Sequence, residues 1–483
     1  MIKYKIIALI IILSIFSCED NPNKNDYSPT LSVLYPNNDS IVKDSITISL
    51  EIQDENNVLK IELWLNGDST DITDYNAPFS LELNTKNYNN GPSILFVRLY
   101  NKDGEIHDSE DINFIINNFL VFNSRFGSSE KNESGHSILQ KADSNFVVLG
   151  SIDNDILLLE SNNKGQVLWS QSYGGSQMDE AHHFEQTSDG GYIISGSTNS
   201  YGFGGSDIWL IKTGEDGLIE WNSYLGTNND EKGGQVLETA DNGFIIIGNY
   251  INDQNSDVWL IKTNSQGDTL WTKTYDDNRD EIGTDIILEE DGGYVILGST
   301  TSSGNEESDI LIIKINSLGT KEWSQNYGIG SNDIGQAILK SSDGGYLIQF
   351  LVEGYGSGNT AVGLLKIDSQ GNVLWTKAFG GSINTKSRMF SQINNYEYIS
   401  ACSQIDYSTN SSHAWLIKIN DNGEILWEKL FGKDGIDKSF SAIPTLDNGF
   451  AITGKTNSYE NNHEEFFDLW ILKTDSEGFS KLD

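Results

Sequence analysis

Short runs of alternating apolar and polar residues recur along the whole chain and predict an all-β protein. Successive side chains of a strand point to opposite faces, so such alternation indicates strands that bury one face. Between residues 29 and 118 the runs read TLSVLYP, SITISLEIQ, LKIELWLNG, FSLELNT, SILFVRLY and INFIINN. Turn residues separate them at regular spacing, which is typical of a two-sheet β-sandwich. We therefore expect residues 29–118 to form a sandwich domain.

Residues 119–483 repeat a unit of roughly fifty residues. The clearest marker is a tryptophan that recurs at intervals of 52, 50, 52, 52 and 52 residues: Trp169, Trp221, Trp271, Trp323, Trp375 and Trp427. Each unit holds four short β-runs, which in residues 182–226 read HHFEQT, GYIISGST, DIWLIKT and LIEWNSYLG. Units of this length, built from short strands and Gly-rich turns, are typical of β-propeller blades.

The two ends of the repeat predict how the ring closes. The aromatic residue of the DGGY turn occurs seven times, at Phe146, Tyr192, Phe244, Tyr294, Tyr346, Tyr398 and Phe450, and a DIWLIKT-like run follows each copy. The tryptophan run occurs six times after residue 165, but FLVFNSRFG at residues 119–127 matches it, with Phe122 in the tryptophan position. We expect a seven-bladed propeller closed by strand 119–127, because such closure leaves no open sheet edge.

The first residues predict export and a lipid anchor. Lys3 and Lys5 precede an apolar run at residues 6–16 that is too short to cross a bilayer, so a signal peptide over residues 1–17 fits best. The sequence IFSC resembles a bacterial lipobox, which implies lipid attachment at Cys18 and a lipidated tether over residues 18–28. The acidic residues that follow it resemble the export signal of Bacteroidota surface lipoproteins, which implies an outer-membrane, surface-exposed protein. An ordinary signal peptide with an incidental cysteine is the alternative.

Two resemblances extend the prediction for the two domains. The runs VLKIELWLNGD, NAPFSLELNT and VRLYNKDGE resemble the bacterial Ig-like modules of surface proteins, which implies a spacer. The motif Asp-Ser-x-Gly followed by Trp, as in residues 368–375, resembles the tryptophan-docking repeat of quinoprotein-like propellers and also kelch blades. Asp opens the turn, Gly supplies a positive φ, and Trp packs between blades. A motif repeated in almost every blade is expected of architecture.

Cysteine content and charge exclude several function classes. Beyond Cys18 the chain has only Cys402, so neither a disulfide nor the vicinal cysteine pair of quinoprotein dehydrogenases can form. The net charge of −39 argues against nucleic acid as a partner, and it leaves the lipid on Cys18 as the expected link to a membrane. We find no nucleophile elbow, metalloprotease helix, P-loop or dinucleotide fingerprint.

An acidic column stands thirteen residues before the DGGY aromatic: Glu133, Asp179, Glu231, Glu281, Asp333 and Asp437, with Thr385 in the remaining unit. We expect these side chains just before the innermost strands, near one mouth of the central channel. One hypothesis is a cation or polyol site, with Ca²⁺ as its only expected cofactor. The other is that each carboxylate accepts bonds from turn amides or pairs with a lysine repeated in the third run.

Positions that vary between units are the stronger candidates for ligand contacts. Ten residues before the aromatic the chain has His136, His182, Gly234, Thr284, Gln336, Arg388 and Phe440, so we expect a ligand-reading surface that includes His136, His182 and Arg388. Adjacent strand residues face opposite sides, so His182 and His183 should not share one metal ion. Tyr201, Phe203 and Tyr355, in Gly-rich loops, are candidate loop contacts.

These observations favour a non-catalytic cell-surface lipoprotein whose propeller binds a glycan or a protein partner. A polysaccharide-active hydrolase or lyase is the first alternative, because paired carboxylates for glycoside hydrolysis remain open in a chain this acidic. A scaffold for outer-membrane assembly or secretion is the second.

Overall fold

The computed structural model describes residues 30–480 except 89–90, 117, 119, 129, 253–254, 276–279, 302–306, 355–359, 381–383, 407 and 459–465, and it describes no side chains for 91 and 384–388. The expected signal peptide, Cys18, the tether and Tyr355 lie outside the described residues. The described chain is all-β, which confirms the predicted class. It includes no helix long and apolar enough to cross a membrane. The chain divides into two compact units between residues 118 and 119.

The first unit has nine strands: β1 (Leu31–Tyr35), β2 (Ser40–Val42), β3 (Ser45–Ile52), β4 (Val58–Leu65), β5 (Asp68–Asp74), β6 (Leu81–Asn84), β7 (Gly91–Asn101), β8 (Ile106–Asp108) and β9 (Ile112–Ile116). Two 3₁₀ turns, η1 (Glu55–Asn57) and η2 (Thr85–Asn87), connect strands. One sheet has the order β1-β3-β6, and the other has the order β2-β9-β7-β4-β5, with β8 paired to β7.

Alternation along the strands forms the core of this unit. On β4, Ile61, Leu63 and Leu65 are buried, and Val97 and Leu99 of the adjacent β7 join the same cluster. Side chains from β3, β6 and β9 complete it, so the two sheets share one apolar layer. The sequence pattern located the strands that contribute to this layer.

The second unit consists of four-stranded antiparallel sheets, seven of them among the described residues. In six of them the strands follow chain order. The first and second sheets are β11 (Glu133–Gln140), β12 (Phe146–Ile152), β13 (Asp155–Ser161), β14 (Val167–Tyr173), and β15 (Asp179–Gln186), β16 (Tyr192–Thr198), β17 (Asp207–Thr213), β18 (Ile219–Leu225); the third and fourth are β19 (Asp230–Glu238), β20 (Phe244–Ile251), β21 (Ser256–Thr263), β22 (Thr269–Tyr275), and β23 (Glu281–Leu288), β24 (Tyr294–Thr300), β25 (Asp309–Ile315), β26 (Lys321–Tyr327). The fifth and sixth are β27 (Asp333–Lys340), β28 (Tyr346–Glu353), β29 (Thr360–Ile367), β30 (Val373–Gly380), and β31 (Asn384–Asn394), β32 (Glu397–Asp406), β33 (Ser411–Asn420), β34 (Ile425–Phe431).

The seventh sheet joins the two ends of this unit. Its order is β10 (Phe122–Phe126), β37 (Asp468–Thr474), β36 (Phe450–Thr456) and β35 (Asp437–Pro444). Strand β10 pairs antiparallel with β37, from Phe122 opposite Lys473 to Phe126 opposite Leu469. The N-terminal segment of the repeat region therefore supplies the outer strand of the last sheet.

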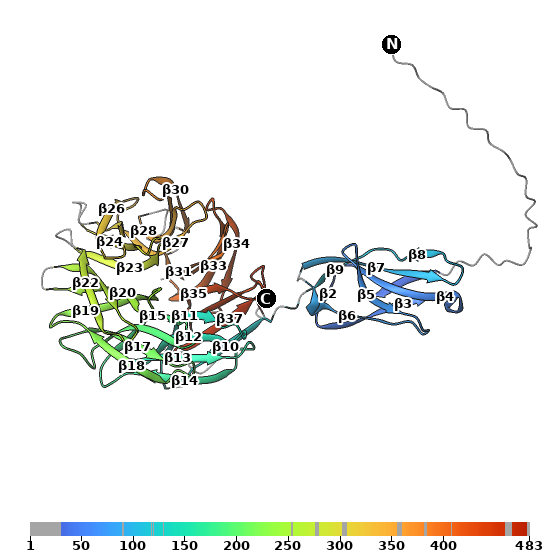
Figure 1. Ribbon diagram of the computed structural model, residues 1–483, viewed down its shortest axis with the longest axis horizontal. Coiled ribbons are helices and arrows are strands. Elements are labelled where there is room, and N and C mark those ends of the chain that lie inside the picture. The colour runs from blue at the N-terminus through green and yellow to red at the C-terminus, as the bar shows by residue number, and fades with distance from the viewer. Residues whose placement is uncertain are drawn as a thin grey trace, which may run out of the picture. The chain divides into compact units, whose positions relative to one another are not determined.

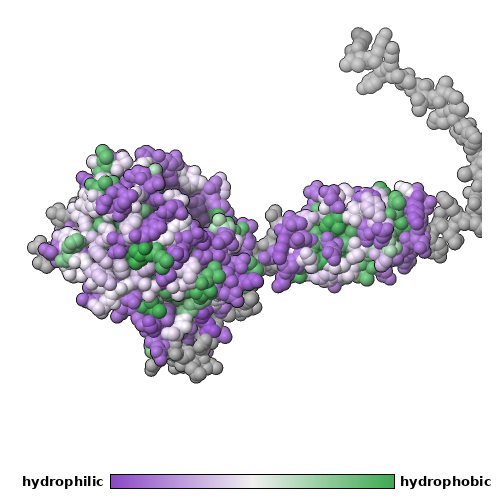
Figure 2. Space-filling model, turned by 60° about the horizontal axis from the view of Figure 1, so that its bottom comes forward, coloured by the Kyte–Doolittle hydropathy of each residue, from purple (hydrophilic) through white to green (hydrophobic). Residues whose placement is uncertain are grey.

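The sheets follow one another around a common centre, as Figure 1 shows. The first strand of each sheet contacts the first strand of the next, and β35 of the last sheet contacts β11 of the first. Apolar clusters fill the spaces between sheets; for example, Val147 and Leu149 of the first sheet pack with Tyr192 and Ile194 of the second. The face of this unit seen in Figure 2 is largely hydrophilic, with small separate apolar patches. This sheet arrangement is typical of a β-propeller.

Candidate functional site

The acidic column lies buried at the start of the first strands. Each described member is at most 5 % exposed: Glu133, Asp179, Glu231, Glu281, Asp333 and Asp437. Five of them are the first residue of their strand and Glu231 is the second. We had expected them just before the strands, but they belong to the strands themselves. Thr385 falls among the residues whose side chains are not described.

These carboxylates hold the loop that enters each sheet. Asp179 accepts hydrogen bonds from the Gly175 amide at 2.8 Å, from Ser200 Oγ at 2.9 Å and from Thr198 Oγ1. Asp437 is held in the same way by the Lys433 amide at 3.0 Å and by two hydroxyl groups. Burial raises the pKa of Glu133, Glu231, Asp333 and Asp437. The contacts show a structural use for the column and no opening toward a polyol.

The repeated lysines pair with a different set of acids. Lys212 Nζ lies 3.0 Å from Asp189, Lys262 3.0 Å from Asp241, and Lys473 2.9 Å from Asp447. Each of these aspartates belongs to the DGGY-type turn of the same sheet. In these three pairs the lysine of the third strand binds a turn aspartate and not a member of the acidic column.

The first sheet carries the same ion pair with the charges exchanged. Its third strand has Glu160 where the other sheets have lysine, and Lys141 stands at the start of the turn, where four of the other sheets have threonine or serine. Lys141 Nζ lies 3.3 Å from Glu160 and 2.9 Å from Glu215. The Glu160 carboxylate also accepts a bond from Trp169 Nε1 at 3.0 Å.

The variable position ten residues before the aromatic is a β-bulge. In the sheets that begin with β11 and β15, the pairing register shifts between Gly135 and Ser137 and between Ala181 and His183, which leaves His136 and His182 as the extra residues. A bulge also stands at this point in the other sheets, and Arg388 occupies it in β31, although its side chain is not described. Because of the bulge, these side chains do not follow the regular in-and-out alternation of the strand.

The two adjacent histidines contact different neighbours. His182 Nε2 lies 2.8 Å from Ser197 Oγ within its own sheet, whereas His183 Nδ1 lies 3.1 Å from the Val236 carbonyl oxygen of the next sheet. His136 packs edge-on against Phe440 of the last sheet. No group of three or more His, Cys, Asp or Glu side chains that could hold a metal ion exists among the described residues.

Side chains one position after the bulge join neighbouring sheets near the centre. Besides His183, Gln235 Oε1 accepts a bond from the Ile286 amide at 2.7 Å, and Asp285 Oδ2 accepts one from the Ile338 amide at 2.8 Å. Burial raises the pKa of Asp285 to about 7. These residues fix one first strand against the next.

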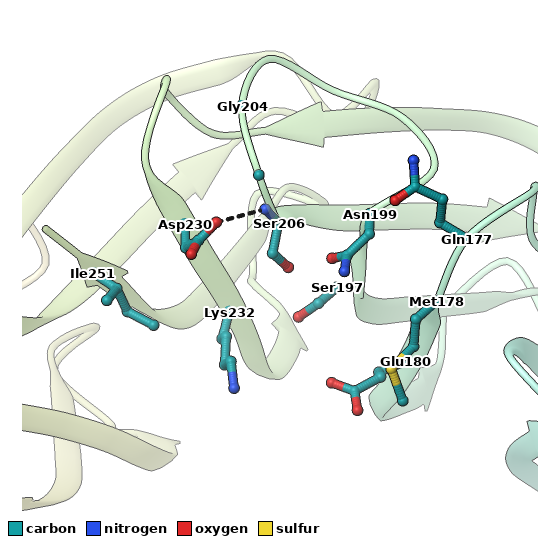
Figure 3. A pocket seen from close by; sticks show the side chains of 11 residues that line it. Gln177, Met178, Glu180, Ser197, Asn199, Gly204, Ser206, Asp230, Lys232 and Ile251 are labelled. Atoms are coloured by element: carbon teal, nitrogen blue, oxygen red, sulfur yellow. Dashed lines mark hydrogen bonds between the residues drawn. The ribbon is translucent and has the colours of Figure 1, made fainter.

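A polar cleft of about 470 Å³ opens between the second and third sheets (Figure 3). Its lining residues come from the loops before β15 and β17, from the starts of β15 and β19 and from the ends of β16 and β20: Gln177, Met178, Glu180, Ser197, Asn199, Gly204, Gly205, Ser206, Asp230, Lys232 and Ile251. Asp230 Oδ1 accepts a hydrogen bond from the Ser206 amide at 2.9 Å, which ties one wall together. The cleft presents amides, hydroxyls and both signs of charge.

Glu180 and Lys232 occupy one column that the sequence analysis did not single out. Twelve residues before the aromatic the chain has Ser134, Glu180, Lys232, Ile282, Ile334, Lys386 and Lys438. This column is more variable in charge than the acidic one beside it, and that variation was a usable signal. In Figure 3 the Glu180 and Lys232 side chains come from opposite walls of the cleft, β15 and β19 respectively, and both point toward the bottom of the view.

The Gly-rich loop at the cleft rim is fixed by its own contacts. Tyr201 stacks on Tyr224 at a centroid distance of 5.4 Å and packs against Trp209 at 5.6 Å, and its hydroxyl donates to the Gly174 carbonyl. The Phe203 amide donates to Asp207 Oδ2 at 2.9 Å, while the Phe203 ring is 65 % exposed. Phe203 is therefore an exposed aromatic ring on an anchored loop that continues into the cleft wall.

The repeated tryptophans pack against a glycine of the next sheet. A Cβ atom at Gly217 would lie 2.6 Å from the Trp169 ring, and one at Gly423 would lie 2.7 Å from Trp375. Trp221, Trp271 and Trp427 contact the equivalent glycines at 267, 319 and 478, and Trp323 lies at the same place on β26. Phe122 meets Gly165 in this way, so it occupies the tryptophan position of the last sheet.

Cys402 offers no nucleophile for catalysis. Its side chain is fully buried, and burial raises the pKa of its thiol to about 12.

Comparison with known proteins identifies part of the chain. Residues 29–97 match the family model of the bacterial Ig domain. No curated protein matches the chain. Solved structures that resemble it include a catalytically inactive virginiamycin B lyase from Staphylococcus aureus (12% identity, 73% of this chain and 99% of that chain, TM-score 0.44). A Lactobacillus plantarum protein (11%, 73% and 98%, 0.45) and a chain of the Drosophila Plexin A complex with Semaphorin 1b (9%, 73% and 87%, 0.43) are further examples. The comparison thus assigns a bacterial Ig-like domain to residues 29–97, and the propeller-like arrangement of the second unit rests on its own sheets.

Proposed function

We propose that residues 119–483 form a closed seven-bladed propeller that binds a glycan without catalysis, through the cleft between its second and third sheets. The protein is a cell-surface lipoprotein anchored through Cys18, and the Ig-like domain holds the propeller away from the membrane. A protein partner is the second candidate ligand class. The pairing of β10 with β37 supports the closed ring, because it joins the two ends of the repeat in one sheet.

The single observation that carries the proposal is where the cleft lies. Two of its lining residues, Glu180 and Lys232, stand at a position that differs between sheets. The Ser206–Asp230 contact in its wall recurs as Ser256–Asp280 and Ser308–Asn332. Recurrent residues serve the architecture, whereas a binding site occupies one asymmetric place.

The chemistry of the cleft favours a glycan. Sugar hydroxyls both donate and accept hydrogen bonds, and Gln177, Asn199, Ser197 and Ser206 offer both kinds of partner. Apolar faces of sugar rings pack on aromatic side chains, and the Phe203 ring is exposed on the loop that continues into the cleft.

The alternative of a glycoside hydrolase needs two carboxylates that face each other across the scissile bond. The acids among the lining residues are Glu180 and Asp230. Asp230 accepts a hydrogen bond from the Ser206 amide at 2.9 Å, and the equivalent residues Asp280 and Asn332 accept the same bond in the next two sheets, so this carboxylate serves the loop structure. This arrangement favours binding over hydrolysis.

A glycan array probed with residues 27–483, with and without Ca²⁺ and followed by an assay for released oligosaccharides, tests the proposal. We expect binding without turnover, unaffected by Ca²⁺. Release of oligosaccharides would support the hydrolase or lyase instead, and co-purification with outer-membrane barrel proteins in place of glycan binding would support the scaffold.

The anchor is tested separately. Cys18→Ala should abolish incorporation of radiolabelled palmitate and release the protein into the medium, while Cys402→Ala should do neither. Unchanged labelling of the Cys18→Ala protein would show that the anchor assignment is wrong.

A further inference from the structure

Acids come in pairs between adjacent sheets. The members of the acidic column are buried, and of their partners Asp207 and Asp257 are buried while Asp155, Asp309 and Asp468 are half-buried. In each pair one acid opens the third strand of a sheet and the other belongs to the acidic column of the next sheet. The pairs are Asp155 with Asp179, Asp207 with Glu231, Asp257 with Glu281, Asp309 with Asp333, and Asp468 with Glu133. In the first four pairs the partners lie 24 residues apart, and the fifth joins the last sheet to the first.

A backbone hydrogen bond brings the partners side by side. The Glu231 amide donates to the Ser206 carbonyl oxygen, directly before Asp207, at 2.7 Å. The same bond, also 2.7 Å long, joins Asp333 to Ser308 and Glu133 to Phe467, which directly precede Asp309 and Asp468. The two acids of each pair are therefore adjacent residues across a sheet-to-sheet boundary.

In the pair Asp207–Glu231 the carboxylates face each other. Both residues are fully buried. A Cβ atom at Gly226 would overlap Asp207 Oδ1 and would lie 2.7 Å from Glu231 Oε2, so both oxygens border the same point. Asp207 Oδ2 accepts the Phe203 amide, and the Glu231 oxygens accept the amide and hydroxyl of Thr227.

One buried oxygen in each of three pairs has no hydrogen-bond donor among the described residues. These oxygens are Asp207 Oδ1, Asp333 Oδ1 and Glu133 Oε2. A buried carboxylate oxygen without a donor costs free energy, and a second carboxylate beside it adds repulsion. In each of these three pairs one defined carboxylate oxygen therefore lacks a hydrogen-bond donor among the described residues.

The two remaining boundaries show how the chain avoids this problem. Where the third strand begins with His413 in place of an acid, the partner Asp437 is retained, and the nearby imidazole favours its ionised form. Where the third strand has Ala361, the acidic column has Thr385. Each acid of the acidic column is therefore accompanied by an acid or a histidine near the start of the preceding third strand. Where the column has Thr385 in place of an acid, the third strand has no acid either.

We infer that the pairs Asp207–Glu231, Asp309–Asp333 and Asp468–Glu133 each bind a single proton, shared between facing carboxyl oxygens as a carboxyl–carboxylate hydrogen bond. The proton comes from solvent, and no covalent bond other than the O–H bond forms or breaks. Sharing satisfies the oxygen that has no donor and halves the buried negative charge.

A proton fits these pairs better than a metal ion. Ca²⁺ requires six to eight oxygen ligands, whereas each pair supplies two carboxylates whose other oxygens already accept amide or hydroxyl bonds. The described residues also include no cluster of three or more metal-binding side chains.

Other charged groups near the pairs are few. Asp230 adjoins Asp207–Glu231, and Glu307 adjoins Asp309–Asp333. Lys131 and Asp153 act on Glu133 with opposite sign. Asp285 on the neighbouring first strands also has a raised pKa, so the overall pH dependence of the protein has more than one source.

The inference fixes the sign of a pH effect. Burial raises the pKa of Glu231, Asp333 and Glu133 in the folded protein above its value in the unfolded chain. The stabilisation is therefore fully present below the unfolded pKa, and it is lost as the pH rises through the folded pKa. Proton sharing makes the sheet boundaries most stable in mildly acidic surroundings.

The test replaces one carboxyl group by a neutral isostere. In Asp207→Asn the amide oxygen keeps the bond from Phe203 while the NH₂ group donates to Glu231, which mimics the protonated pair. We expect unfolding at pH 6 to release about one proton fewer than in the wild type. The melting temperature should also fall less steeply between pH 5 and pH 9. Asp434→Asn, at an exposed acid, should change neither quantity.

Asp333→Asn repeats the test in an independent pair, where Oδ2 keeps the bonds from the Ile329 and Gly330 amides. Proton release equal to that of the wild type in both variants would overturn the inference. So would a melting temperature of the wild type that rises with added Ca²⁺ and falls with a chelator, because that result assigns the pairs to a cation.

Discussion

At the scale of single residues, close packing between sheets explains why particular glycines recur. The glycine that follows the outer strand, such as Gly226, lies against the carboxylates of the acid pair. The glycine of the Asp-Ser-x-Gly turn instead meets the tryptophan of the preceding sheet and has a positive φ, for example +78° at Gly478 against Trp427. The repeat therefore contains two glycines for two different reasons.

Gly226→Ala should destabilise the protein by about 1–3 kcal/mol, because the new methyl group overlaps the Asp207 carboxylate in a packed boundary. Gly214→Ala is the matched control, since its Cβ would lie no closer than 3.1 Å to a neighbouring atom. Denaturant unfolding of both variants measures the difference. Equal stability of the two variants would show that the side chains around Gly226 rearrange to accept the methyl group with no loss in the free energy of unfolding.

Lys366→Met should cost about 2–4 kcal/mol, because it leaves Asp421 and Asp343 without their cation. The lysine is 1 % exposed and its Nζ lies 2.7 Å from Asp421. Lys86→Met removes the exposed ion pair with Asp44 and should cost less than about 1 kcal/mol. Similar losses in both variants, measured by thermal unfolding, would contradict the importance of burial.

At the scale of elements, the pattern located strands with apolar or alternating runs of five or more residues and missed three short or polar ones. The apolar third strands, such as β17, are buried along their whole length and were readily recognised. The missed strands β2, β5 and β8 are short or polar; β5 reads DSTDITD at a sheet edge and buries none of its residues fully. Their pairing depends on the neighbouring strand and leaves no periodic trace in the sequence.

The bulge at His136 and His182 was also beyond sequence reasoning. A bulge changes register through backbone pairing, and the residues that occupy it range from glycine to phenylalanine. For the same reason we placed the acidic column before the strand, whereas the pairing begins at the acid itself. The candidate cleft was missed because its residues come from two sheets and several loops.

The closing strand gives an element-scale prediction. A chain that begins at residue 128 lacks β10 and exposes the edge of β37, so it should melt at lower temperature and self-associate, whereas a chain that begins at residue 118 should remain monomeric. A synthetic peptide of residues 118–127 should restore the melting temperature of the shorter chain. If both chains melt alike, β10 does not close the ring.

At the scale of the whole molecule, the chain comprises two compact units with separate cores. Each unit should therefore fold alone, and calorimetry of residues 27–483 should show two transitions that coincide with those of residues 29–118 and 118–483 measured separately. A single transition at a temperature that neither fragment reaches would indicate that the units stabilise each other.

The net charge of −39 is also a property of the whole molecule, and it disfavours anionic partners. Recognition of a neutral ligand must therefore come from the side chains of a particular site. The cleft between the second and third sheets meets that requirement with Glu180, Lys232 and several neutral polar groups. Composition restricts the partner class, and the positions that break the repeat locate the site.

The most direct measurement is a calorimetric titration of the best ligand from the glycan array into three proteins: the wild type, the double variant Glu180→Ala/Lys232→Ala, and the control Ile282→Ala, which changes the same column in a neighbouring sheet. We predict at least about a tenfold loss of affinity in the double variant, equal to about 1.4 kcal/mol, with unchanged affinity in the control and no product released. Equal affinity in the wild type and the double variant, or hydrolysis of the ligand, would contradict the account.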